Sequence, residues 1–141
     1  MKFKYRRFDL FPPSDFFGKF ILKPIITIKI SRAGMVVKYA ALIDSGADFC
    51  IFDAGIGEYL ELDVRSGIEV GFGGIQNAPV AKAYLHQVNL EIGGVQFKTD
   101  IGFSYDISDR GYGIFGQKGF FNKFIVKFDL EKEEIEIKKR I

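Results

Sequence analysis

The chain of 141 residues has one cysteine, four prolines and no tryptophan. A single cysteine, Cys50, excludes a disulfide within the chain and leaves too few soft ligands for a structural zinc site. No apolar run is long enough to span a bilayer, and residues 1–25 lack the apolar centre of a signal peptide. We therefore expect a cytoplasmic protein in a reducing compartment, with no metal, no cofactor and no membrane partner.

An excess of charge of one sign is also missing. Lys and Arg total 20 against 18 Asp and Glu, which gives a formal charge of +2 and no electrostatic reason to expect nucleic acid as a partner. Near the N-terminus, basic and aromatic residues alternate: Lys2, Lys4, Arg6 and Arg7 with Phe3, Tyr5 and Phe8. This pattern is typical of an edge strand with a charged outer face. We expect residues 1–24 to form an N-terminal extension and residues 25–141 the main domain.

Phenylalanine and glycine are abundant, with 16 of each, and this indicates a globular chain with many turns. Ile26, Ile28 and Ile30 alternate with polar residues, which predicts a half-buried strand. A turn at residues 32–34 leads into a second strand, Met35–Ile43. Further strands are predicted from Ile68 towards a glycine-rich hairpin end, and over residues 81–92, 95–103, 125–130 and 134–138.

Three local features are less regular. The inward positions of the strand over residues 81–92 shift by one near His86 and Gln87, which predicts a β-bulge or a bend. Residues 53–60 are expected to form one or two helical turns starting at Asp53, with Ile56, Tyr59 and Leu60 facing inward. Phe120, Phe121 and Phe124 are spaced for one face of a short C-terminal helix.

The segment most suggestive of chemistry is Ala41-Leu42-Ile43-Asp44-Ser45-Gly46-Ala47-Asp48. A carboxylate follows a buried apolar strand, a hydroxyl comes next, and a glycine then permits close approach of another backbone. An aspartate that only makes a turn after a strand is the simpler interpretation of these residues. The segment Gly113-Ile114-Phe115-Gly116, about seventy residues downstream, favours instead the interpretation that Asp44 has a functional role.

Taken in order, these elements resemble the retropepsin-like aspartic peptidases, especially their bacterial and archaeal single-domain members. That family has two apolar residues followed by Asp, Ser or Thr, Gly and Ala, then a glycine-rich flap, then two apolar residues with Gly and a short helix. Here the three parts are residues 42–47, 71–75 and 114–124. The resemblance implies a mostly β, single-lobe acid-protease-type closed β-barrel with a flap hairpin and one short C-terminal helix.

The resemblance also implies roles for individual residues. Asp44 would be the catalytic carboxylate, Ser45 would clasp two active-site loops together, and Gly46 would receive the substrate backbone. The substrate-binding residues would be Ala47, Asp48, Phe72, Gly73, Gly74 and Ile75, and the supporting residues Ile114, Phe115, Gly116 and Gln117. Retroviral members usually have an arginine where this chain has Gln117, whose neutral amide can hydrogen-bond Asp48 but cannot neutralise it.

The chain has one Asp-Ser-Gly, whereas a catalytic pair needs two carboxylates. Asp53-Ala54-Gly55 lacks the hydroxyl and lies too near in sequence to be the second. We therefore expect a homodimer in which Asp44 meets its copy on a two-fold axis, acting on a peptide or protein substrate.

Two other functions stay open. One is a catalytically silent module of the same fold that binds peptides or dimerises, and the other is a small β-barrel carrier of apolar ligands. Nucleophilic chemistry is less favoured, because His86 has no partner at a suitable spacing and Cys50 stands among apolar residues.

Overall fold

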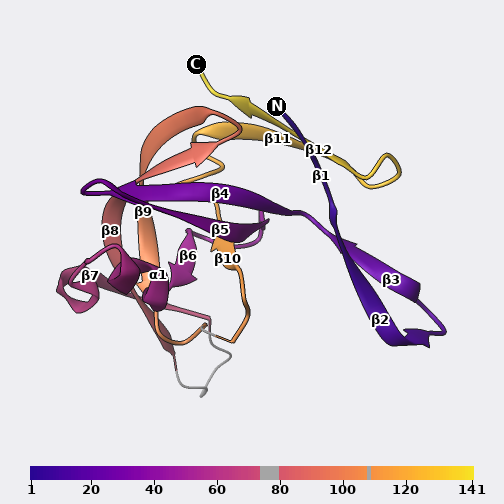
Figure 1. The fold of residues 1–141 in the computed structure, drawn as a ribbon, viewed down its shortest axis with the longest axis horizontal. Helices are drawn as coiled ribbons and strands as arrows, with labels where there is room; N and C mark the ends of the chain where they lie inside the picture. Colours follow the sequence, from indigo (N-terminus) through magenta and orange to yellow (C-terminus); the bar gives the residue numbers. More distant parts are fainter. Residues whose placement is uncertain (74–79, 108) are drawn as a thin grey trace.

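The computed structural model describes residues 1–73, 80–107 and 109–141 (Figure 1). Within them the chain is mostly β, with one α-helix and one short 3-10 helix. The strands are β1 (Lys2–Lys4), β2 (Arg6–Ser14), β3 (Gly18–Lys23), β4 (Ile25–Arg32), β5 (Met35–Ile43), β6 (Ile51–Asp53), β7 (Ile68–Phe72), β8 (Ala81–Ile92), β9 (Val95–Ser104), β10 (Gly113–Phe115), β11 (Phe124–Asp129) and β12 (Glu134–Lys139). In this part of the chain, no helix has the length and apolar composition needed to cross a membrane.

The main sheet closes into a ring of strands. Its order is β4-β5-β10-β6-β9-β8-β7, and an additional pairing between β4 and β8 joins the two sides. Most pairs are antiparallel, but β10 runs parallel to β5 and β6 runs parallel to β9. The ring therefore brings β10, which follows β5 by some seventy residues, directly beside it.

Large side chains fill the inside of this ring. Phe52, Phe103 and Phe115 have no exposed surface, and the ring of Phe115 stacks on that of Phe120 with centroids 4.3 Å apart. Ile28, Ile30 and Leu90 are buried with them, as alternation in β4 and β8 predicts. A packed interior of this kind argues against the carriage of an apolar ligand within the ring.

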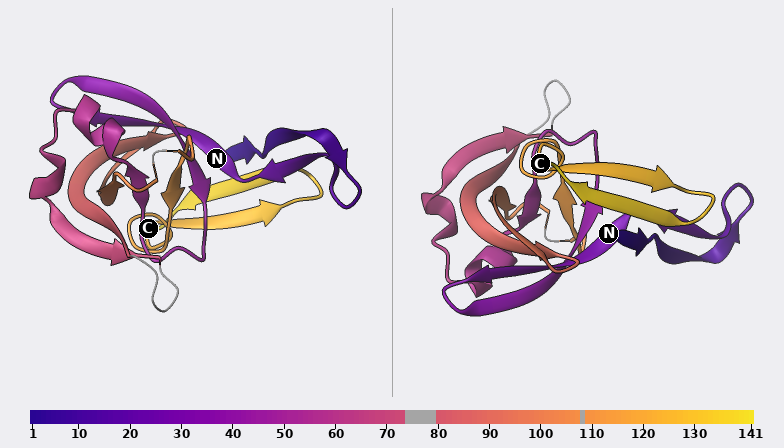
Figure 2. Two further views of the ribbon diagram at one scale, coloured as in Figure 1. Left: turned by 90° about the horizontal axis from the view of Figure 1, so that it is seen from below. Right: turned by 90° about the horizontal axis from the view of Figure 1, so that it is seen from above.

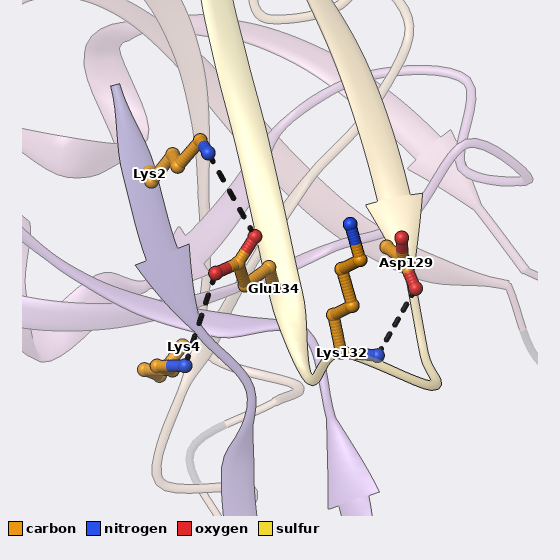
Figure 3. Close-up of polar contacts among 5 residues, drawn as sticks. All are labelled: Lys2, Lys4, Asp129, Lys132 and Glu134. Carbon is orange, nitrogen blue, oxygen red and sulfur yellow. Dashed lines mark hydrogen bonds and ion pairs between the residues drawn. The ribbon is translucent and has the colours of Figure 1, made fainter.

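A second sheet, in the order β1-β12-β11, lies across the ring and brings the two termini together (Figure 1). Its inner face supplies Phe124, Ile135 and Ile137 to the core. In the turn after β11, the Lys132 amide donates a hydrogen bond to the Asp129 carboxylate (Figure 3). On the outer face, the ammonium nitrogens of Lys2 and Lys4 each lie 4.0 Å from a carboxylate oxygen of Glu134. These exposed ion pairs contribute little stability, about 0–1 kcal/mol each.

Among the strands that the structure describes, the remaining two, β2 and β3, pair only with each other, and they extend away from the ring (Figures 1 and 2). Within residues 1–24, β1 pairs with β12, and residues 6–23 form a projecting hairpin.

The predicted C-terminal helix is wrong. In the described part of the chain the one α-helix is α1 (Ala54–Tyr59), between β6 and β7, and residues 117–123 form turns with an isolated β-bridge at Lys118. Gly119 adopts a φ of +107°, outside the helical range, and the Phe121 and Asn122 amides donate five residues back to Gly116 and Gln117. Packing of Phe120 onto Phe115 has outweighed the local helical spacing.

Helix α1 begins as expected, because the Asp53 carboxylate accepts a hydrogen bond from the Gly55 amide at 3.0 Å. Leu60 is buried and Ile56 is half-buried, but the expected inward position of Tyr59 is wrong, since Tyr59 is 60% exposed.

Of the two irregularities expected near His86 and Gln87 in β8, the bulge is wrong. Residues 84–92 pair with β9 in one unbroken register, and residues 81–85 do so with β7. The apolar positions shift because the environment of the strand changes along its length. Val88 and Leu90 face the core where β8 pairs with β4, whereas Leu85 lines a surface pocket where β8 pairs with β7.

Candidate functional site

Asp44 stands at the point where β5 leaves the ring. Its amide donates to the carbonyl of Phe115 at 3.0 Å, which extends the parallel pairing of β5 with β10 by one residue. The side chain is half-buried, and its Oδ1 accepts a hydrogen bond from the Gly46 amide at 2.9 Å. Within the described residues Oδ2 has no hydrogen-bond partner, so one carboxylate oxygen is available to a ligand.

The loop after Asp44 is held against the segment after β10 by main-chain hydrogen bonds. The Gln117 amide donates to the Ala47 carbonyl at 2.8 Å, and the Lys118 amide donates to the Asp48 carbonyl at 2.9 Å. The structure thus brings residues 44–48 together with residues 114–117, the two groups that the sequence motifs single out.

Gly116 makes this contact possible. A Cβ atom at this position would lie 2.3 Å from the carbonyl oxygen of Phe49 and 2.7 Å from that of Ala47. Because both neighbours are backbone atoms, only a residue without a side chain lets the two segments approach so closely. The second glycine of the Gly-Ile-Phe-Gly motif is therefore required by packing behind the Asp44 loop.

Gln117 does not contact Asp48 as expected. Its Nε2 donates to the main-chain carbonyl of Ser45 at 3.1 Å, and it makes no hydrogen bond to the Asp48 carboxylate among the described residues. The amide therefore links the two segments at the position of the Asp-Ser-Gly turn. The Ser45 hydroxyl and the Asp48 carboxylate are both exposed to solvent.

Next to this loop lies a largely apolar pocket of about 290 Å³. Its lining residues are Asp48, Phe49, Val70, Leu85, Asp100 and Lys118. Phe49, Val70 and Leu85 provide the apolar surface, and the three charged residues are exposed at its margin. Of these residues, sequence reasoning had assigned only Asp48 to a site; the signal for Leu85 was the shift of apolar positions in β8.

Phe72, at the end of β7, lies beside this pocket. Its ring meets that of Phe49 edge to face, with centroids 6.1 Å apart. Phe49 in turn lies over Gly102, where a Cβ atom would be 2.7 Å from its ring. Gly73 follows with a φ of +67°, whereas Gly74 and Ile75 lie outside the described residues.

The two other candidates for chemistry lack the required environment. Cys50 is fully buried, and burial raises the pKa of its thiol to about 12, so no thiolate forms at neutral pH. His86 places its Nε2 2.8 Å from the Val64 carbonyl, a contact between a strand and the turn that covers it.

Across the described residues, no three His, Cys, Asp or Glu side chains gather closely enough to hold a metal ion. No protein-family model matches the chain, and a search of curated proteins finds no match. What the chain does must therefore be inferred from the chemistry of Asp44 and its surroundings.

Proposed function

We propose that this chain is an aspartic endopeptidase of the retropepsin-like type, active as a homodimer in the cytoplasm. The observation that carries the proposal is the environment of Asp44. Its carboxylate ends a buried parallel strand pair, receives one local amide and keeps one oxygen free, and the loop that follows it lines an apolar pocket through Asp48 and Phe49. The ring of β4, β5, β10, β6, β9 and β8 supports an acid-protease-type barrel as the fold.

In the proposed dimer, Asp44 and its copy share one proton, because two carboxylates about 3 Å apart do not both ionise. The ionised carboxylate takes a proton from a bound water while the water oxygen forms a bond to the scissile carbonyl carbon. The protonated carboxylate gives its proton to the carbonyl oxygen. The tetrahedral intermediate then collapses, the carbon–nitrogen bond breaks, and the leaving nitrogen receives a proton from the pair.

The pocket suggests what the substrate presents. A cavity of about 290 Å³ with Phe49, Val70 and Leu85 on its surface suits a large apolar side chain close to the scissile bond. Peptides or proteins with such a residue in an extended segment are the proposed substrates.

The proposal is tested by comparing wild-type protein with Asp44→Asn on a library of peptides. Cleavage should fall by at least about 100-fold in the variant, since the pair loses its base. Asp63→Asn is the matched control, because Asp63 is exposed and its side chain makes no capping hydrogen bond. Cleavage that survives in Asp44→Asn, or a rate still rising above about pH 9, contradicts the shared-proton mechanism.

A catalytically silent peptide-binding module is the second candidate. Strand β7 stands at the end of the main sheet, where an extended peptide can add as a further strand. This alternative predicts that peptides with large apolar residues bind equally well to wild-type and Asp44→Asn protein and are cut by neither.

A further inference from the structure

The hairpin of β2 and β3, here called the arm, stands off from the rest of the molecule (Figures 1 and 2). No other strand in the described part of the chain pairs with it. Its base is linked to the body through Lys23, whose ammonium lies 5.8 Å from the centre of the Tyr112 ring. A two-stranded hairpin is marginally stable alone, so an arm of this kind needs a surface to pack against.

The end of the arm carries three exposed aromatic side chains. Phe11 is 88% exposed, Phe16 86% and Phe17 61%. Phe11 belongs to β2, whereas Phe16 and Phe17 lie in the turn after it, where the Ser14 hydroxyl accepts hydrogen bonds from their amides at 3.2 and 3.1 Å. Exposed rings gathered on an ordered turn are typical of a contact surface.

The size of this surface matches that of a symmetric dimer. Aromatic side chains bury 150–250 Å² each, so the three rings of one arm present roughly 450 Å². Two arms, together with an equal area of the surfaces they cover, give about 1,800 Å², which is the size of a standard stable interface.

A second apolar projection leaves the body on the same side as the arm. In all three views, the hairpin of β11 and β12 extends in the same direction as β2 and β3 (Figures 1 and 2). Phe128 is the cross-strand partner of Ile135, which is fully buried, yet Phe128 is 41% exposed and Leu130 62%. The apolar inner face of this hairpin thus continues past the core that covers its other end.

We propose that the arm holds two copies of this chain together, with Phe11, Phe16 and Phe17 of each copy packed on Phe128 and Leu130 of the other. A second copy is the chosen occupant because Asp44 needs a mate that its own chain lacks, and to that extent the inference rests on the proposed function. In a two-fold dimer each arm contacts its partner identically, so both exposed projections are covered at once.

The test compares dimerisation of wild-type protein and of Phe11→Ser/Phe16→Ser/Phe17→Ser by sedimentation over a wide range of concentrations. Wild-type protein should be dimeric, and the triple variant should dissociate at a concentration at least about tenfold higher. Phe128→Ser/Leu130→Ser should weaken the dimer similarly. The control, Val36→Ser/Tyr59→Ser/Ile68→Ser, changes three exposed apolar residues away from the arm and should leave the mass unchanged.

Wild-type protein that stays monomeric, or a triple variant that dimerises like wild type, overturns the proposal. A dimer unaffected by the change at Phe128 and Leu130 overturns the choice of acceptor surface. If wild-type protein is monomeric and binds vesicles of phosphatidylserine and phosphatidylcholine through the arm, the dimer proposal is overturned and the arm is a membrane-binding element. Circular dichroism of each variant checks that the body has folded.

Cleavage assays on the same proteins separate this inference from the proposed function. A dimer that depends on the arm but cuts no peptide keeps the inference and refutes the peptidase. Cleavage that depends on Asp44, in a dimer that the arm variant leaves intact, supports the peptidase and refutes the arm as the dimer contact.

Discussion

Cys50 is fully buried behind the candidate site. Its Sγ accepts a hydrogen bond from the Gly116 amide at 3.4 Å and lies 3.6 Å from the Lys118 carbonyl. Burial raises the pKa of the thiol from 9.0 to about 12, an effect that the Gly116 amide partly offsets. The thiol therefore stabilises the segment behind Asp44 only while it is protonated.

This predicts a loss of stability at high pH. Above about pH 9 the unfolded chain releases the Cys50 proton, whereas the folded chain keeps it until about pH 12, so the free energy of unfolding falls as pH rises through this window. At pH 10.5 the loss should reach about 2 kcal/mol relative to pH 8. Urea unfolding at the two pH values measures it.

Cys50→Ala is the control for this experiment. Tyr39, whose pKa burial raises to about 12, acts in the same direction in both proteins, so the variant should retain a smaller loss. An equal loss in wild type and Cys50→Ala contradicts the assignment to the thiol.

Among the elements, the short strand β10 matters most for the site. It lies between β5 and β6, parallel to one and antiparallel to the other, and its three residues are buried. The Phe115 carbonyl then receives the Asp44 amide, and Gly116 brings the following turn against residues 47 and 49. The position of Asp44 therefore depends on β10 as much as on its own strand.

Gly116→Ala should test this dependence. The added methyl group would overlap the Phe49 carbonyl, so the two segments must separate, and we expect a loss of about 2 kcal/mol or more in the free energy of unfolding. Gly55→Ala is the matched control, because its Cβ atom has only an ordinary 3.5 Å contact and lies in a helix. Denaturant unfolding measures both, and equal stability of the two variants contradicts the steric argument.

For the molecule as a whole, the proposed mechanism makes activity a property of pairs of chains, because each chain has a single Asp44. One copy supplies one carboxylate, and the mechanism needs one ionised and one protonated partner. This mechanism therefore predicts that inactive chains interfere with active ones, whichever surface forms the proposed dimer.

Adding an equal amount of Asp44→Asn chains to a fixed amount of wild type should therefore reduce peptide cleavage to about half, since random pairing places half of the active chains in mixed dimers. Added Asp63→Asn chains should instead increase the rate. Cleavage that is insensitive to added Asp44→Asn chains contradicts an active site shared between subunits.

The sequence by itself determined several strands of the ring, although not the short β6 and β10, and the position of the candidate carboxylate. The alternation of Ile26, Ile28 and Ile30 with polar residues indicates a strand, because successive side chains of a strand point to opposite faces of the sheet. This alternation is a property of the local backbone. In the same way, the strands predicted over residues 81–92 and 95–103 pair as β8 and β9, with Gly93 and Gly94 in the turn between them. The motif at Asp44 was visible because its parts are adjacent in the chain.

Only the tertiary structure decided how distant segments meet. The spacing of Phe120 and Phe124 suits a helix, but stacking of Phe120 on Phe115 holds this segment in turns. The pocket combines Phe49, Val70 and Leu85 from separate elements, and Gln117 bonds to Ser45 rather than to Asp48. Such contacts depend on which strands pair around the ring, and local periodicity carries no information about that pairing.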